Sequence, residues 1–235
     1  MNALVFGGRG ALGAAICRQL RMVGADVIVT SSQAPHQEAS EGTDHWIRVD
    51  PMADSVGIGS LDDLPCLDAV VWAQGVNASD SVIGFDTDVL SRVFEANVTY
   101  IARTLARLVE LDRLATPSRL CILSSIWQEQ ARTAKFSYTV SKAAVAGLVR
   151  SCAADLGPRQ VLVNAVLPGV VDTPMTHANL SVQQISAIRS ASALARLATP
   201  DDIAATVAFL VGPTNGAITG QSITVDAGFS HIRNL

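Results

Sequence analysis

The sequence is poor in charged and aromatic side chains. Charged residues make up 16% of the 235 residues and aromatic residues 5%, whereas 49% are hydrophobic. The formal net charge is -4 and no basic run occurs, which argues against nucleic acid or an anionic membrane surface as the main partner. A chain of this length and apolar content can bury a large core. We therefore expect one domain that spans residues 1–235.

Signatures of several other protein classes are missing. No apolar stretch reaches the roughly 18 residues that span a bilayer, and the N-terminus carries no basic leader or cleavage pattern. Cys17, Cys66, Cys121 and Cys152 form no C-x-x-C pair and mostly lie in apolar segments, so we expect buried, reduced thiols in a cytoplasmic protein. The histidines form no metal-ligand pattern and no G-x-S-x-G elbow occurs, which disfavours a metal site and a hydrolase.

The chain instead contains short apolar runs that alternate with helical patterns. Predicted strands cover residues 4–6, 27–30, 46–49, 69–73, 120–124, 162–167 and 222–225, and predicted helices cover 11–22, 88–111, 138–156 and 201–210. This alternation predicts an α/β fold of the Rossmann type, a doubly wound, mostly parallel seven-stranded sheet with helices on both faces. Residues 31–44 give no clear helix, and residues 51–66 allow only a short one.

A glycine turn follows the first predicted strand, in LVFGGRGALGAAI (residues 4–16). Gly8, Gly10 and Gly13 spell G-x-G-x-x-G, and Gly7, Gly10 and Gly13 spell G-x-x-G-x-x-G. The spacing G-x-x-x-G-x-G also fits, with Ala11 in place of its middle glycine. A strand, a glycine turn and a helix N-terminus together form an anion site. A plain tight turn is the alternative, so the rest of the chain must decide.

Four polar residues fall where the predicted fold would gather them. Tyr138 and Lys142 are four residues apart on one face of a predicted helix, and the spacing is rare by chance in a chain with two tyrosines and two lysines. Ser125 follows a predicted strand at its carboxyl end, the functional edge of such sheets. Asn97 lies on an apolar helical stripe, where an amide needs hydrogen bonds; a purely structural asparagine is the alternative.

On these residues the chain resembles the short-chain dehydrogenase/reductase superfamily, in its short single-domain branch, over nearly its full length. The resemblance implies that Asn97, Ser125, Tyr138 and Lys142 are catalytic, with Tyr138 as general acid/base. It implies hydride transfer between a nicotinamide cofactor and a carbonyl or secondary alcohol substrate, such as a ketone or an oxoacyl group. The ammonium of Lys142 and the oxidised nicotinamide are expected to lower the pKa of Tyr138.

The resemblance also implies cofactor contacts along the chain. The predicted cofactor-binding residues are Gly7, Arg9, Gly10, Ala11, Leu12, Gly13, Thr30, Ser31, Ser32, Asp50, Pro51, Ala73, Gly75, Tyr138, Lys142, Pro168, Gly169, Val171 and Thr173. Two departures from the family pattern stand out. WAQG (residues 72–75) replaces N-N-A-G, and Ala11 replaces a glycine, as in dihydropteridine reductases.

The end of the second predicted strand bears on the choice of cofactor. A G-x-G-x-x-G turn expects an acidic residue there, about 20 positions on, but Thr30, Ser31 and Ser32 occupy this place and Asp26 starts the strand. The G-x-x-G-x-x-G turn suits epimerases with a longer substrate domain, so we assign the turn to the short branch. Hydroxyl groups and Arg9 favour a 2′-phosphate, and we therefore favour NADP(H) over NAD(H).

The resemblance also implies which residues contact the substrate and how the chains assemble, but in less detail. In the family, segments after Ser125 and Thr173 close the pocket, which makes Ser125, Trp127, Gln128, Phe136 and His177 candidate substrate contacts. A homotetramer or homodimer is implied through residues 88–111, 138–156 and the last strand. The alternatives are an NAD-dependent alcohol dehydrogenase, an enzyme like dihydropteridine reductase, and a non-catalytic nucleotide sensor.

Overall fold

The computed structural model describes residues 1–31, 45–49 and 61–232, and the centre of this part is one parallel sheet. Its strands are β1 (Asn2–Phe6), β2 (Asp26–Ser31), β3 (His45–Arg48), β4 (Leu67–Trp72), β5 (Leu114–Leu123), β6 (Val161–Pro168) and β7 (Ser222–Val225). The spatial order is β3-β2-β1-β4-β5-β6-β7, and every neighbouring pair is parallel. The order reverses direction at β1, as in doubly wound folds, and confirms the predicted fold class.

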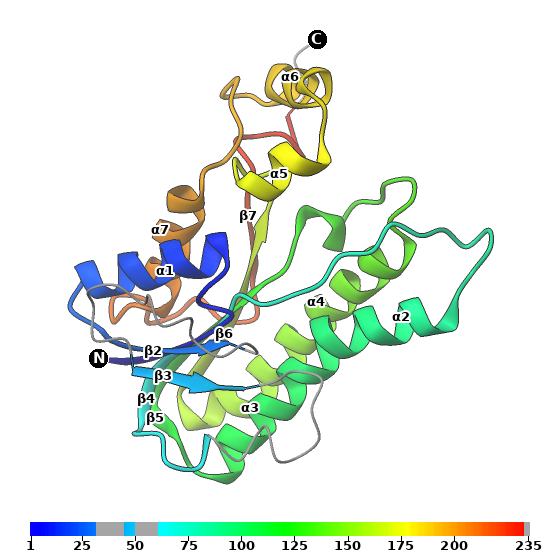
Figure 1. The fold of residues 1–235 in the computed structure, drawn as a ribbon. Coiled ribbons are helices and arrows are strands. Elements are labelled where there is room, and N and C mark those ends of the chain that lie inside the picture. Colours follow the sequence, from blue (N-terminus) through cyan, green and yellow to red (C-terminus); the bar gives the residue numbers. More distant parts are fainter. Residues whose placement is uncertain (32–44, 50–60, 233–235) are drawn as a thin grey trace.

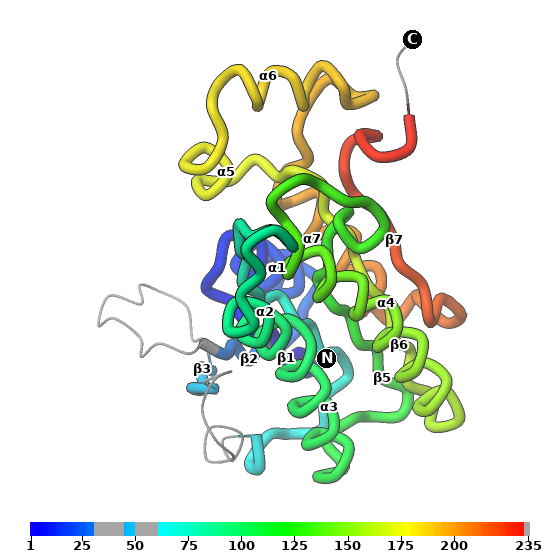
Figure 2. The backbone as a smooth tube through the Cα atoms, turned by 90° about the vertical axis from the view of Figure 1, so that its right-hand side faces the viewer, coloured from blue at the N-terminus to red at the C-terminus, as the bar shows by residue number. Residues whose placement is uncertain are grey.

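Helices cover both faces of the sheet (Figure 1). The α-helices are α1 (Ala11–Met22), α2 (Thr87–Phe94), α3 (Tyr100–Glu110), α4 (Phe136–Leu156), α5 (Pro174–Asn179), α6 (Val182–Ala191) and α7 (Pro200–Val211). Short turns of other helix types are η3 (Glu95–Thr99), η4 (Ile126–Gln128) and η5 (Gly157–Arg159). Helices α1 and α7 pack on one face, and α2, α3 and α4 lie on the other (Figures 1 and 2).

The strands divide their side chains between two hydrophobic clusters. Along β1, Leu4 and Phe6 enter the cluster beneath α3 and α4, whereas Ala3 and Val5 enter the cluster beneath α1 and α7. Successive side chains of a strand point to opposite faces, so a continuous apolar run fills both layers. Helices α5 and α6 stand apart from these layers, beyond the carboxyl end of β6 (Figures 1 and 2).

The structure differs from the predictions in several places, among them helices α5 and α6, which were not predicted. The predicted helix over residues 88–111 is interrupted by the π-helical turn η3, and β5 begins at Leu114, before the predicted start at residue 120. The prediction of buried thiols is wrong for Cys66, which is exposed; Cys152 is half-buried, whereas Cys17 and Cys121 are buried. Cys66 directly precedes β4 and therefore lies outside the covered sheet.

Two further properties bear on function. Within the described ranges, no helix combines the length and apolar character needed to cross a membrane. The same part of the chain contains no group of three or more histidine, cysteine, aspartate or glutamate side chains arranged to hold a metal ion.

Candidate active site

The glycine turn between β1 and α1 is shaped for close backbone approach. Gly7 has a φ of +73°, and a methyl group there would lie 2.8 Å from the backbone nitrogen of Gln74. At Gly13 a methyl group would lie 2.2 Å from the Gly7 carbonyl oxygen, so α1 packs directly on the turn. Ala11, by contrast, is the exposed first residue of α1. The replaced glycine is therefore the one that this backbone needs least.

The turn fits an anionic dinucleotide. Gly10 is the N-cap of α1 and provides no side-chain cap, and the first turn of the helix holds no acidic residue. The N–H groups and the positive dipole end therefore remain available to a phosphate. Arg9 is exposed in this turn. The residues present therefore suit the pyrophosphate of a nicotinamide cofactor.

Asn97 is fully buried within the π-helical turn η3. Its Oδ1 accepts a hydrogen bond of 2.9 Å from Val76 N, and its Nδ2 donates to Val76 O at 2.9 Å and to Ser141 Oγ at 3.0 Å. The amide thus ties the segment after β4 to α4. π-Helical turns often occur at functional sites because they turn a side chain out of the regular helical register.

Tyr138, Lys142 and Ser125 come together at the carboxyl end of β5. The Lys142 ammonium lies 5.7 Å from the centre of the Tyr138 ring and donates to Leu123 O at 3.0 Å. Ser125 is buried, caps η4 by accepting from Trp127 N at 3.3 Å, and hydrogen bonds with the Tyr138 side chain. A methyl group on Gly75 would lie 3.0 Å from Asn97 Oδ1 and 3.6 Å from Lys142 Nζ, so Gly75 keeps this space open.

Burial controls the charge state of the pair. Desolvation raises the pKa of Tyr138, and the hydrogen bond with Ser125 partly opposes it. Desolvation also lowers the pKa of Lys142 to about 8. In the protein alone, burial therefore sets the direction of the Tyr138 pKa shift, whereas the expected lowering includes the charge of a bound oxidised nicotinamide. At neutral pH Tyr138 holds its proton and Lys142 is mostly charged.

The WAQG segment has its own packing. Trp72 is fully buried, stacks on Phe6 with ring centres 5.5 Å apart, and donates from Nε1 to Thr104 Oγ1 at 2.9 Å. The indole therefore ties β4 to α3. Gln74 packs against Gly7, and its amide atoms are buried without a partner among the described residues.

The other predicted cofactor contacts lie along the carboxyl edge of the sheet. Leu12 lies in the first turn of α1, and Ala73, directly after β4, donates from its N to Phe6 O at 2.9 Å. Further along this edge, Pro168 ends β6, Val171 is buried, and Thr173 caps α5. Thr30 is only 1% exposed, so its hydroxyl is enclosed by the surrounding protein. Ser31 is placed only by its backbone pairing with Arg48. Ser32, Asp50 and Pro51 lie outside the described residues.

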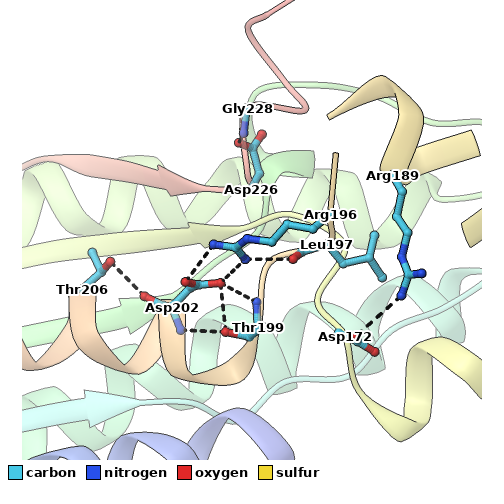
Figure 3. A network of polar contacts seen from close by, with 9 residues as sticks. All are labelled: Asp172, Arg189, Arg196, Leu197, Thr199, Asp202, Thr206, Asp226 and Gly228. Carbon is cyan, nitrogen blue, oxygen red and sulfur yellow. Dashed lines mark hydrogen bonds and ion pairs between the residues drawn. The ribbon is translucent and has the colours of Figure 1, made fainter. Parts of the chain in front are cut away.

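A polar network anchors the chain behind this edge (Figure 3). Asp226 packs against Gly169, where a methyl group would lie 2.5 Å from its Cβ, and accepts from Gly228 N at 2.8 Å. Asp202 pairs with Arg196 at 2.6 Å and closes a capping box with Thr199 at the start of α7. These contacts fix the segments on either side of α5 and α6.

An apolar cavity of about 250 Å³ opens between Trp127 on η4, Val170 after β6 and residues of α6. Trp127, Val170, Leu180, Ala187, Ile188 and Phe229 form its apolar lining, and the polar residues at it are Gln184 and Arg132. Its volume of about 250 Å³ lies just below the range of about 300–1,000 Å³ typical of ligand pockets. Trp127 begins this wall two residues after Ser125, and α6 supplies the opposite wall.

The predicted substrate residues fall into two groups. Trp127 lines the cavity. The other four have partners within the described chain. Ser125 hydrogen bonds with Tyr138, Gln128 Nε2 donates to Ser222 Oγ at 2.9 Å, Phe136 meets Phe85 edge to face, and His177 Nε2 lies 2.6 Å from Asp172 Oδ1. The cavity lining does not include them.

Sequence patterns did not point to several residues that build the site. Ser141 receives the Asn97 amide and donates to Tyr138 O at 2.8 Å; its place one turn from Tyr138 was the available signal. Arg132 and the cavity wall on α6 fall within the two segments expected to close the pocket, after Ser125 and after Thr173, but the sequence did not single out these residues.

Comparison with known proteins agrees with this geometry. The site defines a nicotinamide-dependent oxidoreductase on a doubly wound fold, and a family model described as enoyl-(acyl carrier protein) reductase matches residues 8–230. The chain belongs to the short-chain dehydrogenase/reductase superfamily, and it is an oxidoreductase that interconverts alcohols and carbonyl compounds.

Relatives match nearly end to end. Cyclopentanol dehydrogenase of Comamonas sp. is 29% identical over 97% of this chain and 96% of its own length. The 3-oxoacyl-[acyl-carrier-protein] reductase FabG of Rickettsia bellii is 28% identical over 97% and 95%. A solved short-chain dehydrogenase/reductase from Serratia marcescens superposes with a TM-score of 0.86, at 29% identity over 97% of each chain.

Proposed function

We propose that this protein is an NADP(H)-dependent reductase of ketones or oxoacyl groups in which Tyr138 is the general acid/base. One observation carries the proposal: Tyr138 hydrogen bonds with Ser125 and lies beside the buried ammonium of Lys142. Trp127, two residues after Ser125, lines an apolar cavity that suits a substrate body. A binding protein without turnover has no use for this combination of groups.

The chain's own residues divide the work of carbonyl reduction. When bound, the nicotinamide cofactor supplies the hydride. Tyr138 keeps its proton at neutral pH because burial raises its pKa, so it can donate that proton to the substrate oxygen as charge develops there. Ser125 donates a hydrogen bond to the same oxygen. Lys142, charged below about pH 8, stabilises the phenolate that remains and holds cofactor hydroxyls.

The preference for NADP(H) rests on the end of β2. No carboxylate ends this strand, so nothing there repels a 2′-phosphate. Because Thr30 is enclosed, we assign the phosphate contacts to Arg9, Ser31 and Ser32. The affinity for NADPH should exceed that for NADH, and Arg9→Gln should reduce the difference. Equal affinities in the unaltered protein would contradict the assignment.

Two relatives suggest the substrate class. One is named for a cyclic secondary alcohol and the other for an oxoacyl thioester. The small apolar cavity favours a compact ketone. Steady oxidation of NADPH and NADH should be measured with cyclic ketones and an acetoacetyl thioester. Turnover of at least one ketone is expected; no turnover across the panel, from a folded protein that binds the cofactor, would refute the proposal.

We extend the proposal to the domain organisation, the cellular location and the oligomeric state of the protein. The chain acts as one catalytic domain, because both hydrophobic clusters are built on one sheet. A cytoplasmic homodimer or homotetramer follows from the family resemblance, and light scattering would test the assembly.

A further inference from the structure

Arg132 is the charged group at an otherwise apolar cavity. The other polar residue there, Gln184, uses its Oε1 to accept from Ser181 N at 2.9 Å in the capping box of α6. The remaining lining is aliphatic or aromatic. A ligand that fills this space therefore meets apolar surface over its body and one guanidinium at its edge.

No carboxylate in the described part of the chain neutralises Arg132. It takes part in none of the ion pairs found there, and its side chain is exposed at the cavity rim. An arginine without a protein partner keeps five N–H donors in a planar fork that matches a carboxylate.

The charge next to Arg132 has the same sign. Arg132 acts electrostatically on Lys135, and together with burial it lowers the pKa of that ammonium. Lys135 Nζ donates only to neutral oxygens, those of Asn77, Ala78 and Ser79, at 3.0–3.1 Å. Asp80 is the opposing carboxylate near Lys135, and it accepts hydrogen bonds from Ser137 N and Oγ. Lys135 does not line the cavity, so Arg132 is the cation at its rim, and the charge that acts on it electrostatically is that of another cation.

We infer that the substrate is an amphipathic oxo acid, with an apolar body in the cavity and a carboxylate end paired with Arg132. The inference rests on the proposed carbonyl chemistry and adds a recognition element to it. In the proposed arrangement the carbonyl lies at Ser125, which accepts from the cavity-lining Trp127 N at 3.3 Å, and the carboxylate lies at Arg132 on the cavity rim. Charge-assisted, bidentate hydrogen bonds then fix the orientation of a ligand that apolar contacts alone would leave free to turn.

A matched pair of ketones tests the inference by turnover. 4-Oxocyclohexanecarboxylate and 4-oxocyclohexanecarboxamide share the reacting carbonyl and the ring and differ in charge. We expect kcat/KM for the acid to exceed that for the amide by about 10- to 100-fold, the range of a charge-assisted hydrogen bond. Arg132→Met should remove the difference, mainly through KM, and Arg132→Lys should keep part of it. Arg92→Met, which removes an exposed arginine outside the cavity lining, should leave the preference intact.

Binding separates this inference from the proposed function. Cyclohexanecarboxylate and cyclohexanecarboxamide should be titrated calorimetrically into the full chain with and without NADP⁺. Tighter binding of the acid that is lost in Arg132→Met supports the inference even if no ketone is reduced. Turnover of both ketones with equal kcat/KM overturns the inference while the reductase function stands. Equal or absent binding of both ring compounds also overturns it.

Discussion

The Lys142 ammonium lies 5.7 Å from the centre of the Tyr138 ring, one turn further along α4, and its hydrogen bond goes to the carbonyl of Leu123 at the end of β5. One helix thus delivers both groups, and one strand end holds the lysine in place. A buried ammonium with a single neutral partner is costly. This unfavourable burial of Lys142 occurs beside Tyr138, the residue proposed to transfer the proton.

Replacing Tyr138 with phenylalanine tests the proton donor. Tyr138→Phe removes the hydroxyl and keeps the ring, so it should lower kcat by at least about 100-fold, the usual contribution of general acid catalysis. Affinity for the cofactor should change little, as measured by fluorescence titration of NADPH. A variant that kept normal turnover would remove Tyr138 from the acid/base role.

Replacing Lys142 with methionine should separate stability from activity. The pKa of this lysine falls from 10.5 to about 8 on folding, a cost of about 3 kcal/mol at pH 7. The lost hydrogen bond to Leu123 offsets about 1 kcal/mol. Lys142→Met should therefore raise the free energy of unfolding by about 2 kcal/mol in urea titrations, while turnover and cofactor binding fall. A less stable variant would contradict this account of its burial.

The same lysine predicts a pH dependence. The folded state binds fewer protons than the unfolded state between about pH 8 and pH 10.5, so the contribution of Lys142 to the free energy of unfolding rises with pH across that window. Function should move the other way, because the ammonium loses its charge above about pH 8. The Kd for NADPH should rise above this pH, and a Kd that stayed constant to pH 10 would count against contact with Lys142.

The glycine turn gives a matched pair of substitutions. Gly13→Ala places a methyl group 2.2 Å from the Gly7 carbonyl, so α1 must move and the Kd for NADPH should rise at least tenfold. Ala11→Gly restores the family glycine at an exposed helix start. It should cost about 1 kcal/mol or less in stability and leave the Kd nearly unchanged. Much tighter cofactor binding by Ala11→Gly would show that the departure matters.

The bond between Trp72 and Thr104 should stabilise the core. Thr104→Val leaves the buried indole N–H without an acceptor, which should lower the free energy of unfolding by about 1–3 kcal/mol. Trp72→Phe also removes the bond but leaves no unpaired donor, and a double-mutant cycle would isolate the coupling. Additive effects of the two substitutions would show that the hydrogen bond contributes nothing.

Where the apolar pattern of the sequence is strong, the predicted helices and strands agree closely with the observed ones. The apolar run before the glycine turn, the helix that carries Tyr138 and Lys142, and the last strand Ser222–Val225 all appear in the structure. The π-helical turn at Asn97 could not be predicted, since its apolar spacing resembles that of an ordinary helix and tertiary bonds to Val76 and Ser141 select it. The exposure of Cys66 likewise depends on where the chain enters the sheet.

The sequence by itself determined the parallel sheet, the glycine turn and the residues available for catalysis, because periodicity and spacing along the chain are local properties. Only the tertiary structure decided which of these groups meet and which are charged. Burial of Tyr138 and Lys142 shifts both pKa values toward the neutral forms, and the cavity lined by Trp127 and α6 takes its walls from segments up to about a hundred residues apart. Solvent exclusion and contacts between distant segments arise from packing, so no local pattern records them.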